Sequence, residues 1–311
     1  MDCLAHWSLD RPPFGDGAVL PIAGRLPLLA KLRHGLAYGG TAALSGPEGT
    51  GKTVLARQLL EEFGAAGWGT AYLPRPLADP ADWLARLDPD GAAAGGPNGG
   101  AGAFTRLESF LRNRLAAGGR LLAAVDDMQT AREPGPGDLL RALHNVTEGG
   151  QRALHLLLVG QPAWLDREGR GDGLASFFAV RASLPPLNPE ECLFYLQARL
   201  ARAGRGEGVI TRRAALRLAA ASRGRPRDLD RLMELALITG YGLGVRRITP
   251  DIADMAAADL GLPPGPAARP AFDPVDDESV EDRLPPGQDP DMGGPDAGPV
   301  DVLALLSASP D

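Results

Sequence analysis

The stretch Gly46-Pro47-Glu48-Gly49-Thr50-Gly51-Lys52-Thr53 decides the fold of this 311-residue chain. It fits the pattern G-x-x-x-x-G-K-[ST] at every fixed position, and it lies between an apolar run at Thr41–Ser45 and a helical pattern at Lys52–Phe63. Glycines in such a loop let backbone N–H groups converge on an anion, and the start of the following helix adds its positive end. We therefore predict that these eight residues form a phosphate-binding loop.

The last two residues of this loop extend the prediction from phosphate to a nucleotide. The ammonium of Lys52 can reach β- and γ-phosphates, and the hydroxyl of Thr53 can complete the shell of a magnesium ion. Lys52 is one of only two lysines in the chain, beside 30 arginines, so its place at the required position is informative. We expect ATP and Mg²⁺ as the ligands, and an ordinary glycine-rich turn is the alternative.

A second motif follows the apolar run Leu121–Val125, where two aspartates end the predicted strand. A carboxylate that ends a strand beside a phosphate-binding loop lies where the water ligands of Mg²⁺ are found. We assign Asp126 to the metal side and Asp127 to the position of a base or a water-orienting residue. The alternative is an Asp-Asp pair that only forms a turn at the end of the strand.

Residues 20–187 alternate short apolar runs with helical patterns, which predicts an α/β fold. The runs are almost continuously apolar, as strands covered on both faces of a sheet must be. Such alternation favours a three-layer core with a parallel sheet. The expected strands are 41–45, 70–73, 121–125, 154–159 and, more weakly, 180–184, and the expected helices are 52–63, 104–116 and 137–147.

From Asn188 the pattern becomes helical throughout, which predicts a small all-helical lid domain at residues 188–260. Asn188-Pro189-Glu190-Glu191 has the features of a helix start, with a cap, an early proline and acidic residues near the positive end. Further helices are expected to begin at Thr211, Arg227 and Thr249. Residues 1–19 are expected to be a segment that packs on the α/β core.

The end of the chain differs in charge from the rest. Residues 262–311 contain eleven acidic and two basic residues, a net charge of −9, whereas the whole chain carries −7 and residues 1–261 therefore carry +2. This stretch also has eleven prolines and one aromatic residue, so we predict a disordered acidic tail at residues 261–311. Gly91–Ala103 is predicted to be a flexible surface loop.

The sequence favours a cytoplasmic protein. The stretch Met1–Asp10 lacks the basic and apolar pattern of a signal peptide, and no window holds about 18 consecutive apolar residues, so no membrane span is predicted. Cys3 and Cys192 lie far apart and have no metal-binding spacing.

Several motifs, in this order and spacing, make residues 4–260 resemble the AAA+ ATPases. The resemblance is narrower to the general secretion pathway protein A type and the related transposition helper ATPases. It rests on the following stretches: His6-Trp7-Ser8-Leu9, Pro13-Phe14, Leu44–Thr53, Val125-Asp126-Asp127-Met128-Gln129, Leu158-Val159-Gly160-Gln161-Pro162, Leu184-Pro185-Pro186-Leu187 and Gly224-Arg225-Pro226-Arg227.

The resemblance implies roles for two further residues and a shared site. Gln161 matches the sensor 1 position, where a polar side chain orients the attacking water. Arg227 matches the sensor 2 arginine, which reports the nucleotide to the lid; an ordinary charge at the start of a helix is the alternative for this residue. Because sites of this family are shared between subunits, a homo-oligomer is implied as well.

The sequence departs from the family pattern at three places. Asp127 stands where the family usually has glutamate, and Phe177 stands where an arginine finger is common, with Arg167, Arg170 and Arg181 nearby. A shorter carboxylate arm can misplace the attacking water by about 1 Å, enough to slow hydrolysis. Members of the secretion type usually continue into a membrane span, whereas this chain continues into an acidic stretch.

These features leave three functions open. The first is an AAA+ ATPase that couples ATP binding and hydrolysis to a conformational change acting on an unidentified protein partner or assembly. The second is a nucleotide-gated recruitment module with little or no hydrolysis. The third is a DNA-associated helper, which an arginine cluster in the helical domain supports only weakly because a solvated helix surface explains the cluster better. The cluster is Arg199, Arg202, Arg205, Arg212, Arg213, Arg217, Arg223 and Arg225.

Overall fold

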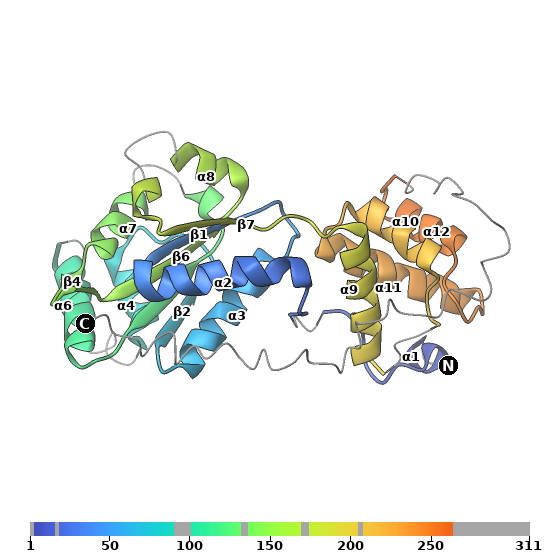
Figure 1. Cartoon of the computed structure of the whole chain (residues 1–311), viewed down its shortest axis with the longest axis horizontal. Coiled ribbons are helices and arrows are strands. Elements are labelled where there is room, and N and C mark those ends of the chain that lie inside the picture. The colour runs from blue at the N-terminus through green and yellow to red at the C-terminus, as the bar shows by residue number, and fades with distance from the viewer. Residues whose placement is uncertain are drawn as a thin grey trace. The chain divides into compact units, whose positions relative to one another are not determined.

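The computed structural model describes residues 3–15, 19–89, 101–131, 136–168, 174–204 and 208–263. The predicted loop at Gly91–Ala103 lies outside this description except for its last three residues, and of the predicted tail only residues 261–263 are described. The described residues form two compact units, one built on a sheet and one built of helices (Figure 1). The two units are described separately below.

The α/β unit contains residues 23–47 and 52–184 and is built on a five-stranded sheet. All neighbouring strands are parallel, in the order β2-β3-β6-β1-β7. The predicted α/β class is therefore confirmed, and so is the weak fifth strand. The strands are β1 (Thr41–Ser45), β2 (Gly69–Leu73), β3 (Leu121–Val125), β6 (Leu154–Gly160) and β7 (Val180–Ser183).

Helices connect these strands and cover both faces of the sheet (Figure 1). The α-helices are α2 (Leu26–His34), α3 (Lys52–Ala65), α4 (Pro80–Leu87), α6 (Ala101–Ala116), α7 (Pro136–His144) and α8 (Pro162–Glu168). Shorter turns are η1 (Ala23–Arg25), the π-helical η2 (Gly35–Gly39), η3 (Met128–Thr130) and η4 (Leu174–Phe177). A small antiparallel hairpin, β4 (Thr147–Glu148) with β5 (Gln151–Arg152), precedes β6.

Alternate residues of each central strand enter different cores, which explains the continuous apolar runs. Leu121, Ala123 and Val125 of β3 pack in the core that includes residues of α4, α6, α7 and α8. Leu122 and Ala124 of the same strand pack in the opposite core, with α2 and α3. Since side chains of a strand alternate between its faces, a strand covered on both sides is apolar at nearly every position.

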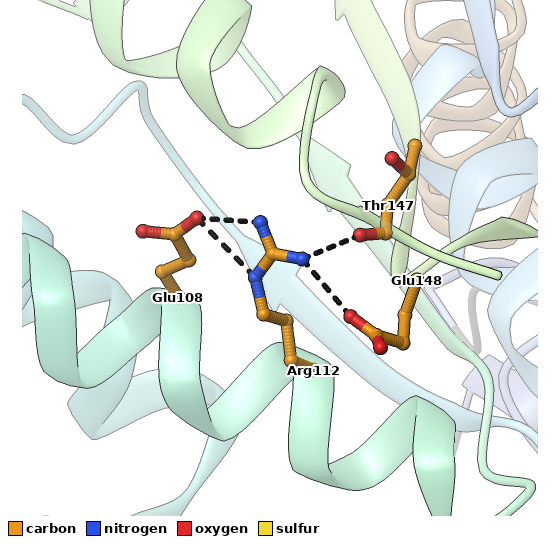
Figure 2. Close-up of polar contacts among 4 residues, drawn as sticks. All are labelled: Glu108, Arg112, Thr147 and Glu148. Carbon is orange, nitrogen blue, oxygen red and sulfur yellow. Dashed lines mark hydrogen bonds and ion pairs between the residues drawn. The ribbon is translucent and has the colours of Figure 1, made fainter. Parts of the chain in front are cut away.

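A single arginine joins the hairpin β4–β5 to helix α6 (Figure 2). The guanidinium of Arg112 lies between two glutamates: its Nη2 donates to Glu108 at 2.9 Å, and its Nη1 donates to Glu148 at 3.0 Å. The same Nη1 also donates to the carbonyl of Thr147 at 2.7 Å. Because exposed ion pairs contribute little to stability, this contact orients the hairpin more than it stabilises the fold.

The helical unit contains the four predicted helices after residue 188, which confirms that part of the fold. They are α9 (Pro189–Arg202), α10 (Arg212–Ser222), α11 (Pro226–Gly242) and α12 (Pro250–Asp259). The start of α9 is a capping box, in which Asn188 Oδ1 accepts from the backbone N–H of Glu191 at 2.8 Å and Glu191 Oε2 accepts from the N–H of Asn188 at 2.9 Å. Each side chain thereby satisfies an N–H that the helix leaves unpaired.

Residues 3–15 pack in the helical unit, which differs from the predicted place of residues 1–19 on the α/β core. Helix α1 (Cys3–Trp7) contacts α11, and the indole N–H of Trp7 donates to the carbonyl of Leu237 at 2.9 Å. Trp7 is 1% exposed, and Phe14 is buried in the same core as α9–α12. Short helices alone bury little apolar area, so this segment completes their core.

No helix among the described residues combines the length and the apolar character that crossing a membrane requires.

Candidate functional site

The predicted phosphate-binding loop lies between the end of β1 and the start of α3. Gly49 and Gly51 have φ angles of +80° and +95°, a left-handed conformation that other residues adopt only with strain. Thr50 between them is fully buried at 0% exposure. The alternation of glycines therefore has a local reason, because the chain must turn sharply here before α3 begins at Lys52.

The side chain of Lys52 folds back onto the loop that precedes it. Its ammonium donates to the carbonyl of Pro47 at 2.8 Å, and the contact is exposed to solvent. An ammonium in this place adds a positive charge to the one that the first turn of α3 provides. The loop can therefore offer an anion both backbone N–H groups and a cation.

The structure brings together the two residues predicted to hold a metal. The hydroxyl of Thr53 on α3 donates to Oδ2 of Asp126 at 2.6 Å, although the residues are 73 positions apart. Asp126 is 4% exposed, and its other oxygen, Oδ1, accepts from the backbone N–H of Asp127 at 2.8 Å. A hydroxyl beside a carboxylate is a set of hard oxygen ligands that suits Mg²⁺.

Tyr72, which the sequence analysis did not select, completes the surroundings of this carboxylate. Its hydroxyl donates to Oδ2 of Asp126 at 2.9 Å, and the guanidinium of Arg57 lies 4.6 Å from the centre of its ring. Burial raises the pKa of the Tyr72 hydroxyl above its usual value of 10, and the hydrogen bond to Asp126 raises it further. Tyr72 therefore remains a donor throughout the physiological pH range.

A weak signal for Tyr72 was present in the sequence. β2 pairs with β3 in a register that places Tyr72 opposite Ala124, two residues before Asp126. A polar aromatic group near the end of the strand was thus the local sign. Its meaning depended on which strand lies next to β2, and that is a property of the tertiary structure.

Asp127 adopts a strained backbone conformation at the end of β3. Its φ and ψ angles are 51° and 40°, in the left-handed region that residues other than glycine occupy infrequently, aspartate more often than most. The carbonyl of Asp127 accepts from both the N–H and the hydroxyl of Thr130, at 2.8 and 2.7 Å. Strain of this kind persists where neighbouring contacts hold the residue, and it is concentrated at functional sites.

The structure links Asp127 to Gln161 through a residue that was not assigned a role, Gln129 on η3. The amide nitrogen of Gln129 donates to Oδ1 of Asp127 at 2.8 Å, and its amide oxygen accepts from the backbone N–H of Gln161 at 3.1 Å. The two residues expected to orient water therefore belong to one hydrogen-bonded chain at the ends of β3 and β6.

Arg227 is in the first turn of α11 and contacts the part of the loop that groups with the helical unit, Glu48–Gly51. Its backbone N–H donates to the carbonyl of Gly49 at 3.2 Å, and its guanidinium pairs with the carboxylate of Glu48 at 2.7 Å. The side chains of this pair are 61% and 71% exposed, so the pair itself contributes little stability.

The position expected for an arginine finger holds a packed aromatic ring. Phe177 in η4 lies against His144, with ring centres 4.4 Å apart. The guanidinium of Arg181 lies 5.6 Å from the ring of Phe178. Arg170 and the side chain of Arg167 lie outside the described part of the chain.

Comparisons with known proteins agree with this fold. Residues 36–167 match the AAA domain family. Over 236 residues the chain is 30% identical to the general secretion pathway protein A of Aeromonas hydrophila, a match that covers 75% of this chain and 43% of that protein. The chain thus spans less than half the length of this relative.

Solved structures with the same fold share little sequence with this chain. The Aeropyrum pernix ORC2 protein, solved as ADPNP-ADP complexes, has a TM-score of 0.61 at 19% identity, over 80% of this chain and 72% of that one. The Aeropyrum pernix ORC1 protein in complex with DNA has a TM-score of 0.59 at 21% identity, over 82% and 69% of the two chains. With the sheet order and the loop, these findings show that the α/β unit has the AAA+ P-loop fold. Within it, residues 36–167 match the AAA domain family, and the chain is similar to general secretion pathway protein A.

Proposed function

We propose that this protein binds ATP with Mg²⁺ and couples the binding and hydrolysis of ATP to a conformational change that acts on a protein partner or assembly. One observation carries the proposal: the loop Gly46–Thr53 leads from β1 into the first turn of α3, and the hydroxyl of Thr53 donates to Asp126, the residue that follows β3. A buried carboxylate costs stability, so its presence together with the ammonium of Lys52 beside one loop indicates a functional site and not a plain turn.

Each part of the site has a distinct role in this proposal. Backbone N–H groups of the loop and the ammonium of Lys52 bind the phosphates, and Thr53 with Asp126 holds the metal. When bound, Mg²⁺ supplies positive charge that neutralises the phosphate oxygens. Asp127 and Gln161 orient the water, and Gln129 links the carboxylate of Asp127 to the backbone of Gln161.

Arg227 is proposed to report the nucleotide to the helical unit. It begins α11, the helix whose residues Leu229, Leu232 and Met233 are fully buried in the helical core. A guanidinium fixed to such a helix can transmit a change at the loop to the whole bundle. The resulting motion of the lid would act on the partner.

A recruitment module that binds nucleotide and hydrolyses it slowly is the second candidate. Two observations favour it. The side chain of Asp127 is shorter than the glutamate usual at this position in the family, and Phe177 is packed against His144 where an arginine finger would stand. In this version the bound nucleotide orders the partner-binding surface without turnover.

Action on DNA has weaker support. Three members of the arginine cluster already have partners, because Arg199 donates to Tyr195, Arg217 pairs with Asp254, and Arg225 pairs with Asp228. Similarity to a protein solved with DNA at 21% identity shows only the fold. If the cluster contacts phosphates, affinity for DNA will fall steeply with salt, and absence of binding at low salt would exclude this function.

Nucleotide binding, phosphate release and molecular mass, measured on one preparation, separate these functions. The full chain is titrated with ATP and Mg²⁺ in a calorimeter, and its mass in solution is measured with and without the nucleotide. Binding with turnover supports the ATPase, and binding without turnover supports the recruitment module. A flat titration would overturn the nucleotide site and both functions that depend on it.

A further inference from the structure

We propose that Gln129 is a positioning residue that ties the carboxylate of Asp127 to the end of β6, so that Asp127 and Gln161 act as one unit. This inference rests on the proposed hydrolysis of ATP and assigns a new residue to it. Gln129 is placed by the turn η3, directly after the two aspartates, and contacts both residues that are proposed to orient water.

The chemistry at the two ends of the Gln129 side chain requires an amide. The ionised carboxylate of Asp127 can only accept a hydrogen bond, and the backbone N–H of Gln161 can only donate one. The orientation of the amide is therefore determined by its partners, with nitrogen toward Asp127 at 2.8 Å and oxygen toward Gln161 at 3.1 Å. A glutamate at this place keeps the acceptor and loses the donor.

The backbone on both sides is arranged to permit this approach. Asp127 is held in the left-handed conformation by Thr130, which accounts for the direction in which the turn leaves β3. At the end of β6, a Cβ atom on Gly160 would lie 2.9 Å from the Trp164 ring, 3.2 Å from Met128 Cβ and 3.3 Å from the amide oxygen of Gln129. The absence of a side chain at Gly160 thus leaves room for the turn and for the Gln129 amide.

The hydrogen bonds of Gln129 have a consequence for catalysis. An aspartate is one methylene shorter than the glutamate usual at this position in related sites, so its carboxylate has less reach and depends more on the neighbour that holds it. Because the bonds of Gln129 go to Asp127 and Gln161 and not to the loop at residues 46–53, its loss should lower turnover without weakening nucleotide binding.

The test compares three variants of the full chain: Gln129→Glu, which removes the donor, Gln129→Ala, which removes both contacts, and the control Gln151→Glu. Gln151 is exposed on the hairpin β5, so the control adds the same charge outside the site. At pH 8 we expect Gln129→Glu and Gln129→Ala to lower kcat at least tenfold with an ATP Kd within twofold of wild type, and Gln151→Glu to change neither.

The comparison of turnover with binding distinguishes a positioning role from a general structural one. A structural defect would weaken ATP binding and thermal stability together with turnover, whereas loss of positioning lowers kcat alone. A wild-type kcat in Gln129→Glu, or an ATP Kd that weakens as much as kcat falls in either Gln129 variant, would overturn the proposal.

Hydrogen exchange at the backbone N–H of Gln161 tests the link between Gln129 and Gln161, called the tether below, without any turnover. Its protection should persist in Gln129→Glu, which keeps the acceptor, and fall at least tenfold in Gln129→Ala. If wild type binds ATP and releases no phosphate, the proposed hydrolysis fails while this measurement still decides whether the tether exists. An amide that exchanges equally fast in wild type and Gln129→Ala would contradict the tether itself.

Discussion

The hydroxyl of Tyr72 donates to Oδ2 of Asp126 at 2.9 Å, the same oxygen that accepts the hydroxyl of Thr53. The carboxylate is 4% exposed, so these donors replace the water that it has lost. The proposed metal ligand is thus held in place by two strands and a helix before any ion binds. This arrangement connects the stability of the α/β unit to its proposed function.

Removal of the Tyr72 hydroxyl should destabilise the protein through Asp126. We expect Tyr72→Phe to lower the free energy of unfolding by about 1–2 kcal/mol, because a buried carboxylate loses one of its donors. Chemical denaturation measures this, and Tyr38→Phe, whose ring is 46% exposed, is the control. In the background Asp126→Ala the effect of Tyr72→Phe should largely disappear; additive effects would show that the two groups are not coupled.

The chain has two lysines, so substitution of Lys52 in the proposed nucleotide site can be compared with substitution of Lys31 outside it. Lys52→Ala should weaken ATP binding at least tenfold, which is about 1.4 kcal/mol, while leaving the unfolding transition unchanged. Lys31→Ala removes the same charge from an exposed position of α2 and should bind ATP as wild type does. Calorimetric titration of the three proteins decides this, and unchanged binding in Lys52→Ala would count heavily against the assignment of the site.

Arg227 and Arg231 lie one turn apart on α11. A comparison of their alanine variants therefore distinguishes a specific role of Arg227 from a general effect of positive charge on this helix. If Arg227 reports the nucleotide to the lid, Arg227→Ala should lower ATP turnover about tenfold. Arg231→Ala, at an exposed position, should have turnover close to wild type. Thermal unfolding of both variants should stay close to wild type, because exposed charges contribute little to stability. A similar loss of turnover in the two variants would argue against a special role for Arg227.

Two buried histidines should make the α/β unit sensitive to acid. Burial lowers the pKa of His155 from 6.5 to about 4, although its hydrogen bond to the carbonyl of Leu36 opposes the shift. Burial, together with the nearby guanidinium of Arg152, lowers the pKa of His144 to about 4 as well. Because the guanidinium donates to Nε2 of His144 at 2.9 Å, the other ring nitrogen carries the proton and donates to Thr41.

The sign of the resulting pH dependence follows from these lowered values. Between pH 6.5 and about 4 the unfolded chain binds protons that the folded chain does not, so stability is full above pH 6.5 and falls as the pH decreases. Each histidine should contribute up to about 1.4 kcal/mol per pH unit in this window. The free energy of unfolding, measured with urea at several pH values, should fall less steeply with decreasing pH in His155→Gln and in His144→Gln than in wild type. The substitution His34→Gln, at an exposed position, should leave this pH dependence unchanged. The same pH dependence in all four proteins would contradict the buried, neutral state of His144 and His155.

Local sequence patterns were sufficient for the elements and for the loop. The apolar runs predicted all five strands of the main sheet. For β1, β3 and β6, whose residues are all buried, the reason is that a strand packed on both faces has a signature that does not depend on its neighbours. The cap at Asn188 predicted the start of α9 for a similar local reason. The described part of the first 19 residues, 3–15, was assigned to the wrong core, since its sequence does not specify which of two cores will bury Trp7.

The sequence by itself determined where phosphate-binding groups and strand-end carboxylates stand along the chain, because glycines, Lys52 and the paired aspartates act through backbone geometry within a few residues. Only the tertiary structure decided that Tyr72 holds Asp126 and that Gln129 joins Asp127 to Gln161. The reason is that these contacts depend on strand order and register: β2 and β6 flank β3 on either side, although they are separated from it along the chain by helices and loops.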